Sequence, residues 1–267
     1  MQMLQHFVSV RTARMSFLAG ASLFGFSQVA SAADTWQYSI TPYFFAAGID
    51  ATVGVGNVET DVDLNAGDVL ESTESGFMAM LSARKGKWTF AFDGSYFQLK
   101  DGESSSVTGP FGRATAEGTV ELTNRQWVYQ PMLAYQLLDD RLKMAVYGGA
   151  RYTRLRANMN VAIDTSLAAF PGNERDFKAE KKWTDYVVGT HGSFPVADRW
   201  SLVGMADVGT GEDSDISYQL LGAIKWQFHE TVSASLGYRM LHQEFEEDAF
   251  SWDATYSGFI LGAGFTF

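Results

Sequence analysis

The amino-acid sequence predicts an all-β fold, a transmembrane antiparallel up-and-down β-barrel of about ten strands. Apolar side chains alternate with small or polar ones along many segments, as in strands with one face against lipid. Short turn signals alternate with long polar connections. The 267 residues include 20 Phe, 11 Tyr, 7 Trp and 26 Gly but only 5 Pro. No stretch after residue 32 is as long and apolar as a membrane helix. A soluble β-sandwich of the same composition is the alternative fold.

Residues 1–32 have the pattern of a secretory signal peptide. Two arginines precede an apolar stretch at 15–26, and Ala-Ser-Ala at 30–32 matches an A-x-A cleavage site. We therefore predict a signal peptide at 1–32 and an outer-membrane β-barrel domain at 33–267. The chain contains no cysteine, so neither lipoprotein anchoring at a cysteine nor a disulfide is expected.

Four short turn signals divide the rest of the chain. Each joins two alternating runs, as the turn of a β-hairpin does. They are Lys85-Gly86-Lys87, Asp139-Asp140-Arg141, Ala197-Asp198-Arg199 and His229-Glu230-Thr231. The expected strands are 36–49, 76–85, 88–99, 117–138, 142–157, 181–196, 200–209, 216–228, 232–245 and 253–267. The acidic stretch 50–75 has room for an extra hairpin, so eight and twelve strands stay open. Residues 65–72 could form a short helix in this stretch.

The alternation assigns each strand an outward and an inward face. In the final strand, Phe259, Leu261, Phe265 and Phe267 share the outward face. Charged residues are expected to face inward, because an Arg or Lys on the lipid face costs about 2–4 kcal/mol near the midplane. Aromatic residues near the strand ends are expected to form two girdles at the membrane surfaces. One girdle comprises Trp88, Trp200 and Trp226, and the other comprises Tyr96, Trp127, Trp183 and Trp252.

The last 16 residues, WDATYSGFILGAGFTF, end on the aromatic Phe267. This ending resembles the C-terminal signal of bacterial outer-membrane β-barrels. The chain as a whole resembles the small, porin-like outer-membrane barrels of Gram-negative bacteria, whose function is often unassigned. The resemblance implies a location in the outer membrane, contact with its lipid and lipopolysaccharide, and recognition of Phe267 by the barrel-assembly machinery. An even number of strands places both termini on the periplasmic side.

Seven ionisable residues fall on the inward face and form the predicted lumen site. They are Asp93, Arg151, Asp185, His191, Asp207, Lys225 and Arg239. Acids and bases lie at matched depths on neighbouring strands, so one interpretation is a set of salt bridges that holds the barrel shut. The other is a narrow polar path or a small-ligand site. A ten-stranded lumen is only slightly wider than one that side chains fill, so a wide porin is not expected.

No cofactor, metal or nucleic-acid site is expected. The formal net charge is −11 at pH 7, whereas binding to nucleic acid requires Lys and Arg to neutralise phosphates. Asp61, Asp63 and Asn65 begin like a calcium loop, but Gly67 falls one place late and Ser72 stands at position twelve. The acidic residues of the loops are a solvated face, with cation-bridged contact to lipopolysaccharide phosphates as a subsidiary hypothesis.

Three hypotheses for function follow, and none assigns a catalytic residue. The first is a non-enzymatic barrel with a structural or surface-interaction role, and the second is a narrow passive channel with a charged lumen. The third is a barrel enzyme, either a rim protease or a lipid A-modifying enzyme. For a rim protease the nearest candidates are Asp185, Asp207 and His242. The oligomeric state and the permeant solute are not determined by the sequence.

Overall fold

The computed structural model describes residues 35–267 except 56–57, 109–114, 166–172, 213 and 248–249. The chain divides into two units, Met1–Ala32 and Ala33–Phe267. The predicted signal peptide lies outside the described residues, and only the second unit is considered below. The described part contains no helix with the length and hydropathy needed to cross a membrane.

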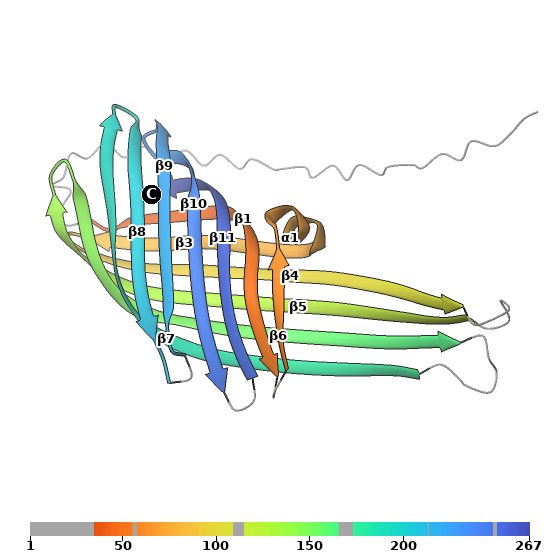
Figure 1. The fold of residues 1–267 in the computed structure, drawn as a ribbon. Helices are drawn as coiled ribbons and strands as arrows, with labels where there is room; N and C mark the ends of the chain where they lie inside the picture. The colour runs from red at the N-terminus through yellow and green to blue at the C-terminus, as the bar shows by residue number, and fades with distance from the viewer. Residues whose placement is uncertain (1–34, 56–57, 109–114, 166–172, 213, 248–249) are drawn as a thin grey trace, which may run out of the picture. The chain divides into compact units, whose positions relative to one another are not determined.

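The described residues form eleven strands and one short helix (Figure 1). They are β1 (Gln37–Val55), β2 (Val58–Leu64), α1 (Ala66–Ser72), β3 (Thr73–Lys85), β4 (Trp88–Thr108), β5 (Thr115–Asp139), β6 (Lys143–Thr165), β7 (Asn173–Ala197), β8 (Trp200–Thr210), β9 (Ser217–His229), β10 (Val232–Glu247) and β11 (Phe250–Thr266). The strands make one antiparallel sheet, which closes because β11 also pairs with β1. β2 and β3 both pair with β1, at different heights. The result is a closed ten-stranded barrel, which confirms the predicted fold class and strand count.

The four predicted tight turns join β3 to β4, β5 to β6, β7 to β8 and β9 to β10. In the first of them Gly86 has φ 58°, a left-handed conformation that glycine adopts without steric cost. Phe267 lies at the same end as the turns, where its N–H donates to the carbonyl of Tyr38 at 2.8 Å. We call this end of the barrel the turn end and the opposite end the loop end.

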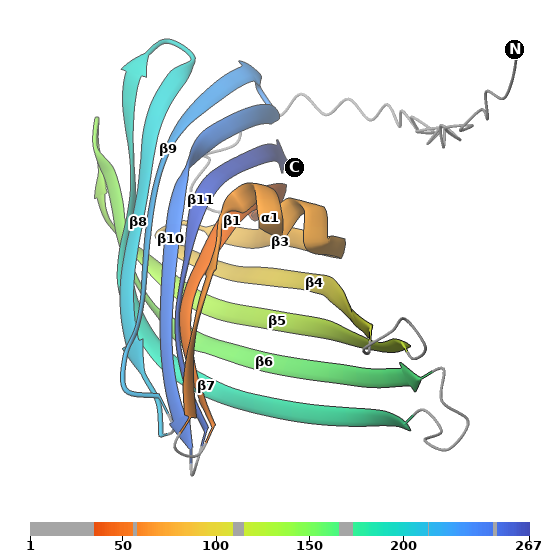
Figure 2. The ribbon, with the colours of Figure 1, turned by 45° about the vertical axis from the view of Figure 1, so that its right-hand side comes forward.

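The strands β4 to β7 are 21 to 25 residues long, although roughly 9–11 residues cross a bilayer. They extend well beyond the other strands toward the loop end (Figure 2). The sequence prediction made three of them too short at the loop end. It ended β4 at residue 99 and β6 at residue 157, and it began β7 at residue 181. The missed parts of β4 and β7 are polar and lack an apolar face, whereas in β6 the sequence alternation continues through Met159, Val161 and Ile163. The ladders continue through all three, for example from Leu99 paired with Asn124 to Thr108 paired with Thr115.

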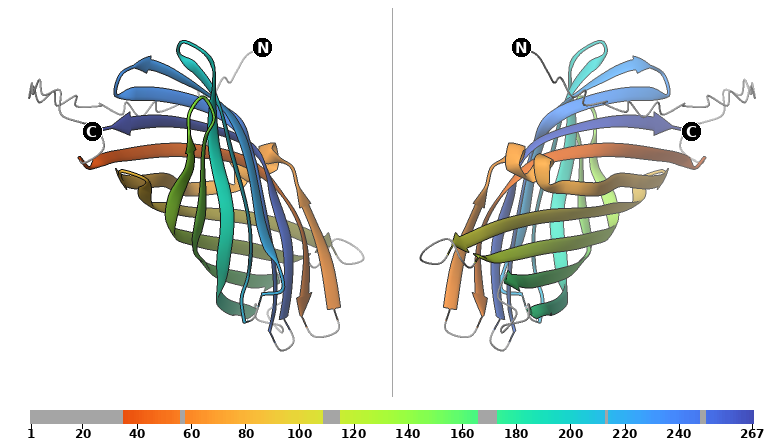
Figure 3. Two further views of the ribbon diagram at one scale, coloured as in Figure 1. Left: turned by 90° about the vertical axis from the view of Figure 1, so that its left-hand side faces the viewer. Right: turned by 90° about the vertical axis from the view of Figure 1, so that its right-hand side faces the viewer.

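The region 50–75 contains both features that the sequence left open. β1 and β2 form the extra hairpin, although its turn lies outside the described residues. The short helix α1 follows, and Asn65 caps it by accepting hydrogen bonds from the N–H groups of Gly67 and Asp68. The helix lies beside β1 (Figure 3). Asn65 is therefore a helix cap, and no group of three His, Asp or Glu side chains suited to a metal occurs within the described ranges.

Large apolar side chains cover the outward face, as the period-two pattern predicted. Leu236 is 59% exposed, Leu261 57% and Phe259 65%, and such a continuous apolar band requires lipid around it. The aromatic residues predicted for the girdle near the turn end are exposed on the outward face, with Trp200 and Trp226 stacked at 5.7 Å. These exposed girdle residues are Trp88, Trp200 and Trp226.

Two residues assigned to the second girdle lie inside the barrel instead. Trp183 is 4% exposed and Trp252 is 8% exposed. Both belong to an apolar cluster that fills the lumen toward the loop end, where Trp183 stacks on Phe245 at 4.6 Å. The expectation was wrong because it weighted the height of these residues above the alternation of the strand. Tyr96 and Trp127 do pair on the outward face, with ring centroids 5.2 Å apart.

A charge placed on the outward face is expected to destabilise the barrel. Leu236→Arg should reduce the free energy of unfolding by about 2–4 kcal/mol, because the guanidinium would sit in hydrocarbon. Urea titration of the protein folded in lipid vesicles measures this. Lys182→Arg, on the exposed side of β7 near the loop end, is the control and should change stability little. An equal effect of both substitutions would contradict the assignment of the outward face to lipid.

Candidate functional site

Two buried ion pairs cross the lumen at mid-height. Nη2 of Arg151 lies 2.6 Å from Oδ1 of Asp207, and Nη2 of Arg239 lies 3.2 Å from Oδ2 of Asp93. The four residues come from β4, β6, β8 and β10. None of these strands is paired with another of the four, so the side chains meet across the lumen rather than along the wall.

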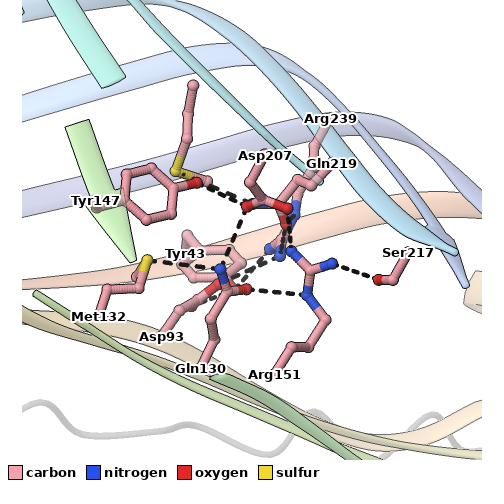
Figure 4. Close-up of polar contacts among 11 residues, drawn as sticks. Tyr43, Asp93, Gln130, Met132, Tyr147, Arg151, Asp207, Ser217, Gln219 and Arg239 are labelled. Atoms are coloured by element: carbon pink, nitrogen blue, oxygen red, sulfur yellow. Dashed lines mark hydrogen bonds and ion pairs between the residues drawn. The ribbon is translucent and has the colours of Figure 1, made fainter. Parts of the chain in front are cut away.

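Hydrogen bonds extend the two ion pairs into one connected layer. Nε of Arg151 donates to Oε1 of Gln130 at 3.0 Å and Nη1 donates to Oγ of Ser217 at 2.5 Å. Nε of Arg239 donates to Oε1 of Gln219 at 2.9 Å. We call this set of side chains the polar layer (Figure 4). Its members are Tyr43, Asp93, Gln130, Tyr147, Arg151, Asp207, Ser217, Gln219 and Arg239.

The carboxylate of Asp207 is the centre of the polar layer. Oδ2 accepts a hydrogen bond from the hydroxyl of Tyr147 at 2.7 Å and from the amides of Gln130 and Gln219 at 3.3 Å each. The hydroxyl of Tyr43 plays a linking role, because it donates to Asp93 at 2.8 Å and accepts from Arg239 at 2.9 Å. Charges buried this deeply are tolerated only when they are paired and hydrogen-bonded.

Formal charge balances within the polar layer, since two guanidinium groups face two carboxylates. Every nitrogen of both guanidinium groups donates a hydrogen bond. The layer therefore presents neither a free base nor an unpaired cation to a ligand. The polar layer can therefore bridge opposite walls of the barrel and close the lumen at mid-height.

Apolar residues fill the lumen on both sides of the polar layer. Met132, Ala134, Ala145 and Tyr147 form a small cluster on one side. On the loop side, Tyr256 donates to Gln126 at 2.6 Å within the larger cluster that contains Trp183 and Phe245. The interior thus contains large apolar residues as well as the polar layer, although the sequence analysis expected inward faces that are small or polar.

The structure brings four of the seven predicted lumen residues together and leaves three outside. Asp93, Arg151, Asp207 and Arg239 belong to the polar layer. Asp185 is paired with Arg151 in the β6–β7 register, but Arg151 bonds to Asp207, and both carboxylate oxygens of Asp185 are buried without a hydrogen-bond partner among the described residues.

Among the described residues, neither His191 nor Lys225 makes a hydrogen bond to the polar layer. The ring of His191 is 6.3 Å from that of Tyr147, and Lys225 is opposite Ser201 and Ser235 closer to the turn end. The search for charges missed the neutral members of the layer, of which Gln130, Ser217 and Gln219 are at most 1% exposed. The sequence signal that could have identified them is their position on the inward face of the strand alternation.

The candidates for a rim protease do not converge. His242 faces outward on β10, where its ring stacks on Tyr218 at 4.6 Å and Nδ1 is 3.0 Å from the hydroxyl of Thr255. Asp185 and Asp207 are buried inside, on the opposite side of the wall.

Basic residues gather on the outward face just beyond the exposed aromatic residues of the loop side. Arg154 and Lys182 are register partners, and so are Arg156 and Glu180. Nε of Arg156 donates to Glu180 at 2.6 Å, and this hydrogen bond holds the pKa of Glu180 below its ordinary value. The guanidinium of Arg154 lies 5.5 Å from the ring centre of Trp127. We call Arg154, Arg156 and Lys182 the basic patch.

No family model matches the chain, and no curated protein matches it. Among solved structures it is similar to the outer membrane protease OmpT from Escherichia coli, with a TM-score of 0.57, 9% identity, and coverage of 90% of this chain and 99% of that chain. The translocator domain of the autotransporter NalP from Neisseria meningitidis matches with a TM-score of 0.41 and 14% identity, over 87% of this chain and 88% of that chain. At this identity, likeness to OmpT concerns the fold alone. The chain shares the fold of small outer-membrane β-barrel proteins.

Proposed function

We propose that this protein is a non-enzymatic outer-membrane barrel that keeps its lumen closed and acts through its surfaces. The observation that carries the proposal is the polar layer, whose two ion pairs tie β4, β6, β8 and β10 together across the lumen. Loss of one partner of such a buried pair is costly, so the layer favours one closed arrangement. A narrow passive channel would require both this layer and the apolar cluster on its loop side to rearrange.

Ion flux separates the closed barrel from the channel. The folded protein, reconstituted in vesicles loaded with a potassium-sensitive dye, is expected to give the same flux as empty vesicles. A porin reconstituted in parallel is the positive control, and heat-modifiable migration on a gel measures how much barrel has inserted. Steady flux that scales with inserted barrel and disappears in Arg239→Ala would overturn the closed-lumen proposal in favour of a charged path.

We propose that the turn end faces the periplasm and that the basic patch contacts lipopolysaccharide. The four short turns and both ends of the barrel domain lie at the turn end. In outer-membrane barrels the short turns are periplasmic, which supports this orientation. The basic patch then lies at the level of the outer headgroups, where guanidinium and ammonium groups suit phosphates. The exposed, strand-terminal Phe267 (77% exposed) supports recognition by the barrel-assembly machinery.

Enzymatic activity is not part of the proposal. The separation of His242 from the inward aspartates supports this choice, because a general base must reach the group that it activates within hydrogen-bonding distance. Peptide or lipid A turnover that is lost in His242→Ala would contradict it.

A further inference from the structure

The barrel wall is interrupted between β1 and β3. Their ladder runs from Gln37 paired with Arg84 to Pro42 paired with Ala79 and stops there. β1 regains a partner on this side only at Ile49, which pairs with Leu64 of β2. Residues 43–48 of β1 and 73–78 of β3 thus face each other without a ladder among the described pairings. We call this interval the wall opening.

Local sequence explains what replaces the ladder. At the far edge of the opening, a Cβ on Gly48 would lie 2.9 Å from the carbonyl oxygen of Leu64. Glycine therefore allows the link from β2 into α1 to cross close to β1. The hydroxyl of Thr73 donates to the carbonyl of Val69 at 2.5 Å, which ties the start of β3 to the helix.

A pocket of about 240 Å³ passes through the wall opening. Phe44 and Phe77, which are 52% and 65% exposed on the outward face, line its mouth. Phe45, Phe97 and Leu241 line its inner part, where the large apolar cluster begins. Val69 and Leu70 of α1 also line it. The lining is predominantly apolar from the outward face to the lumen.

The mouth of the pocket lies within the lipid-facing band, next to its border on the loop side. Phe77 pairs with Tyr96, and Tyr96 pairs with Trp127, so the three aromatic residues form one row across β3, β4 and β5. On β1, the exposed Asp50 lies two residues beyond the opening, and a carboxylate marks the aqueous side of the border. In the proposed orientation, this height corresponds to the outer leaflet.

The geometry points to a lipid site: the wall opening admits one acyl chain of an outer-leaflet lipid into the apolar interior of the barrel. At this height the material against Phe44 and Phe77 is hydrocarbon, and the lining continues inward without a charged barrier until Arg239. All three guanidinium nitrogens of Arg239 are already engaged, so the inner end offers nothing to an anionic headgroup. The headgroup stays at the surface and the chain enters.

The size of the pocket agrees with a single chain. Ligand sites for drug-sized molecules measure roughly 300–1,000 Å³, and this pocket, at about 240 Å³, is below that range. Irregular backbone at membrane depth is tolerated where it lines a cavity or is buried in protein, which fits an interrupted wall beside a helix. This site depends on the proposed orientation for its leaflet, but it does not depend on whether the lumen conducts ions.

Photolabelling from the bilayer tests the site. The full barrel is folded in vesicles of phosphatidylglycerol that include a phosphatidylglycerol with a diazirine near the end of one acyl chain. After illumination, mass spectrometry maps the labelled residues. Labels are expected on inward residues of the pocket, chiefly Phe45, Phe97 and Leu241, together with annular labels on Leu236 and Phe259. The annular labels are an internal measure of reaction efficiency.

A filling substitution provides the matched comparison. Ala47→Trp places an indole in the pocket, and should reduce labelling of Phe97 and Leu241 at least fivefold while leaving annular labelling unchanged. Leu220→Trp, on the lipid face of β9 away from the opening, should leave both unchanged. Because Ala47 is buried, Met78→Trp is a second filling variant, and heat-modifiable migration confirms folding of each. Labels confined to outward residues in the wild-type barrel, or inward labels that neither filling variant reduces, would overturn the proposal.

Discussion

Asp207→Asn is expected to lower the free energy of unfolding by about 3–5 kcal/mol, because it leaves the buried guanidinium of Arg151 without its counter-charge. Asp185→Asn is the same chemical change on an adjoining strand, and it should be neutral or stabilising. The carboxylate of Asp185 is buried and both its oxygens lack a hydrogen-bond partner among the described residues. Removal of its charge therefore relieves a desolvation cost that the nearby Ser214, Arg151 and Ser217 offset only in part.

Urea titration of both variants in lipid vesicles, followed by tryptophan fluorescence, measures the difference. Each variant is compared with the wild-type barrel at one pH and ionic strength, and gel migration confirms that the folded baseline is the same. The double variant Asp207→Asn/Arg151→Met should recover part of the lost stability. It removes both charges of the pair, and the methionine side chain, which is apolar and of similar length, needs no counter-charge. If Asp185→Asn proved as destabilising as Asp207→Asn, the assignment of Arg151 to Asp207 would be wrong.

Phe245→Ala is the second large effect, with an expected loss of about 3–5 kcal/mol. Phe245 is 1% exposed and stacks on Trp183 inside the lumen. Truncation loses the favourable free energy of burying the ring away from water. It also leaves a cavity that the packed walls cannot close. Phe259→Ala removes the same ring from the outward face, where it is 65% exposed. Fluid lipid fills that space, so only the transfer part is lost and the expected cost is clearly smaller.

The comparison of the two Phe→Ala variants tests whether the loop half of the lumen is a packed core. Both are measured by the same urea titration, and xenon or a small hydrocarbon is added to each. Such an apolar solute should recover stability in Phe245→Ala, because it can occupy the new cavity, and should do little for Phe259→Ala. Equal losses in the two variants would indicate that the interior around Phe245 is not packed.

The sequence was most informative about which way each side chain faces. The alternation along β10 and β11 correctly placed Leu236, Phe259 and Leu261 outside, and the alternation along β6 and β10 correctly placed Arg151 and Arg239 inside. Trp183 shares its phase with Asp185, two residues on, so the same rule would have placed it inside. Its assignment to a girdle came from its height along the strand. The two-residue alternation gives the face on which a side chain lies but not its height.

The sequence by itself determined the closed barrel, because a two-residue period and turn chemistry are local properties and each strand carries them independently. Only the tertiary structure decided which inward charges meet. Arg151 and Asp185 are register partners, yet the long guanidinium of Arg151 reaches across the lumen to Asp207. The wall opening was also beyond the sequence, because it depends on where a glycine and a short helix fall relative to a neighbouring strand. Distances across a closed cylinder arise from the register and tilt of all its strands together, and no local pattern contains them.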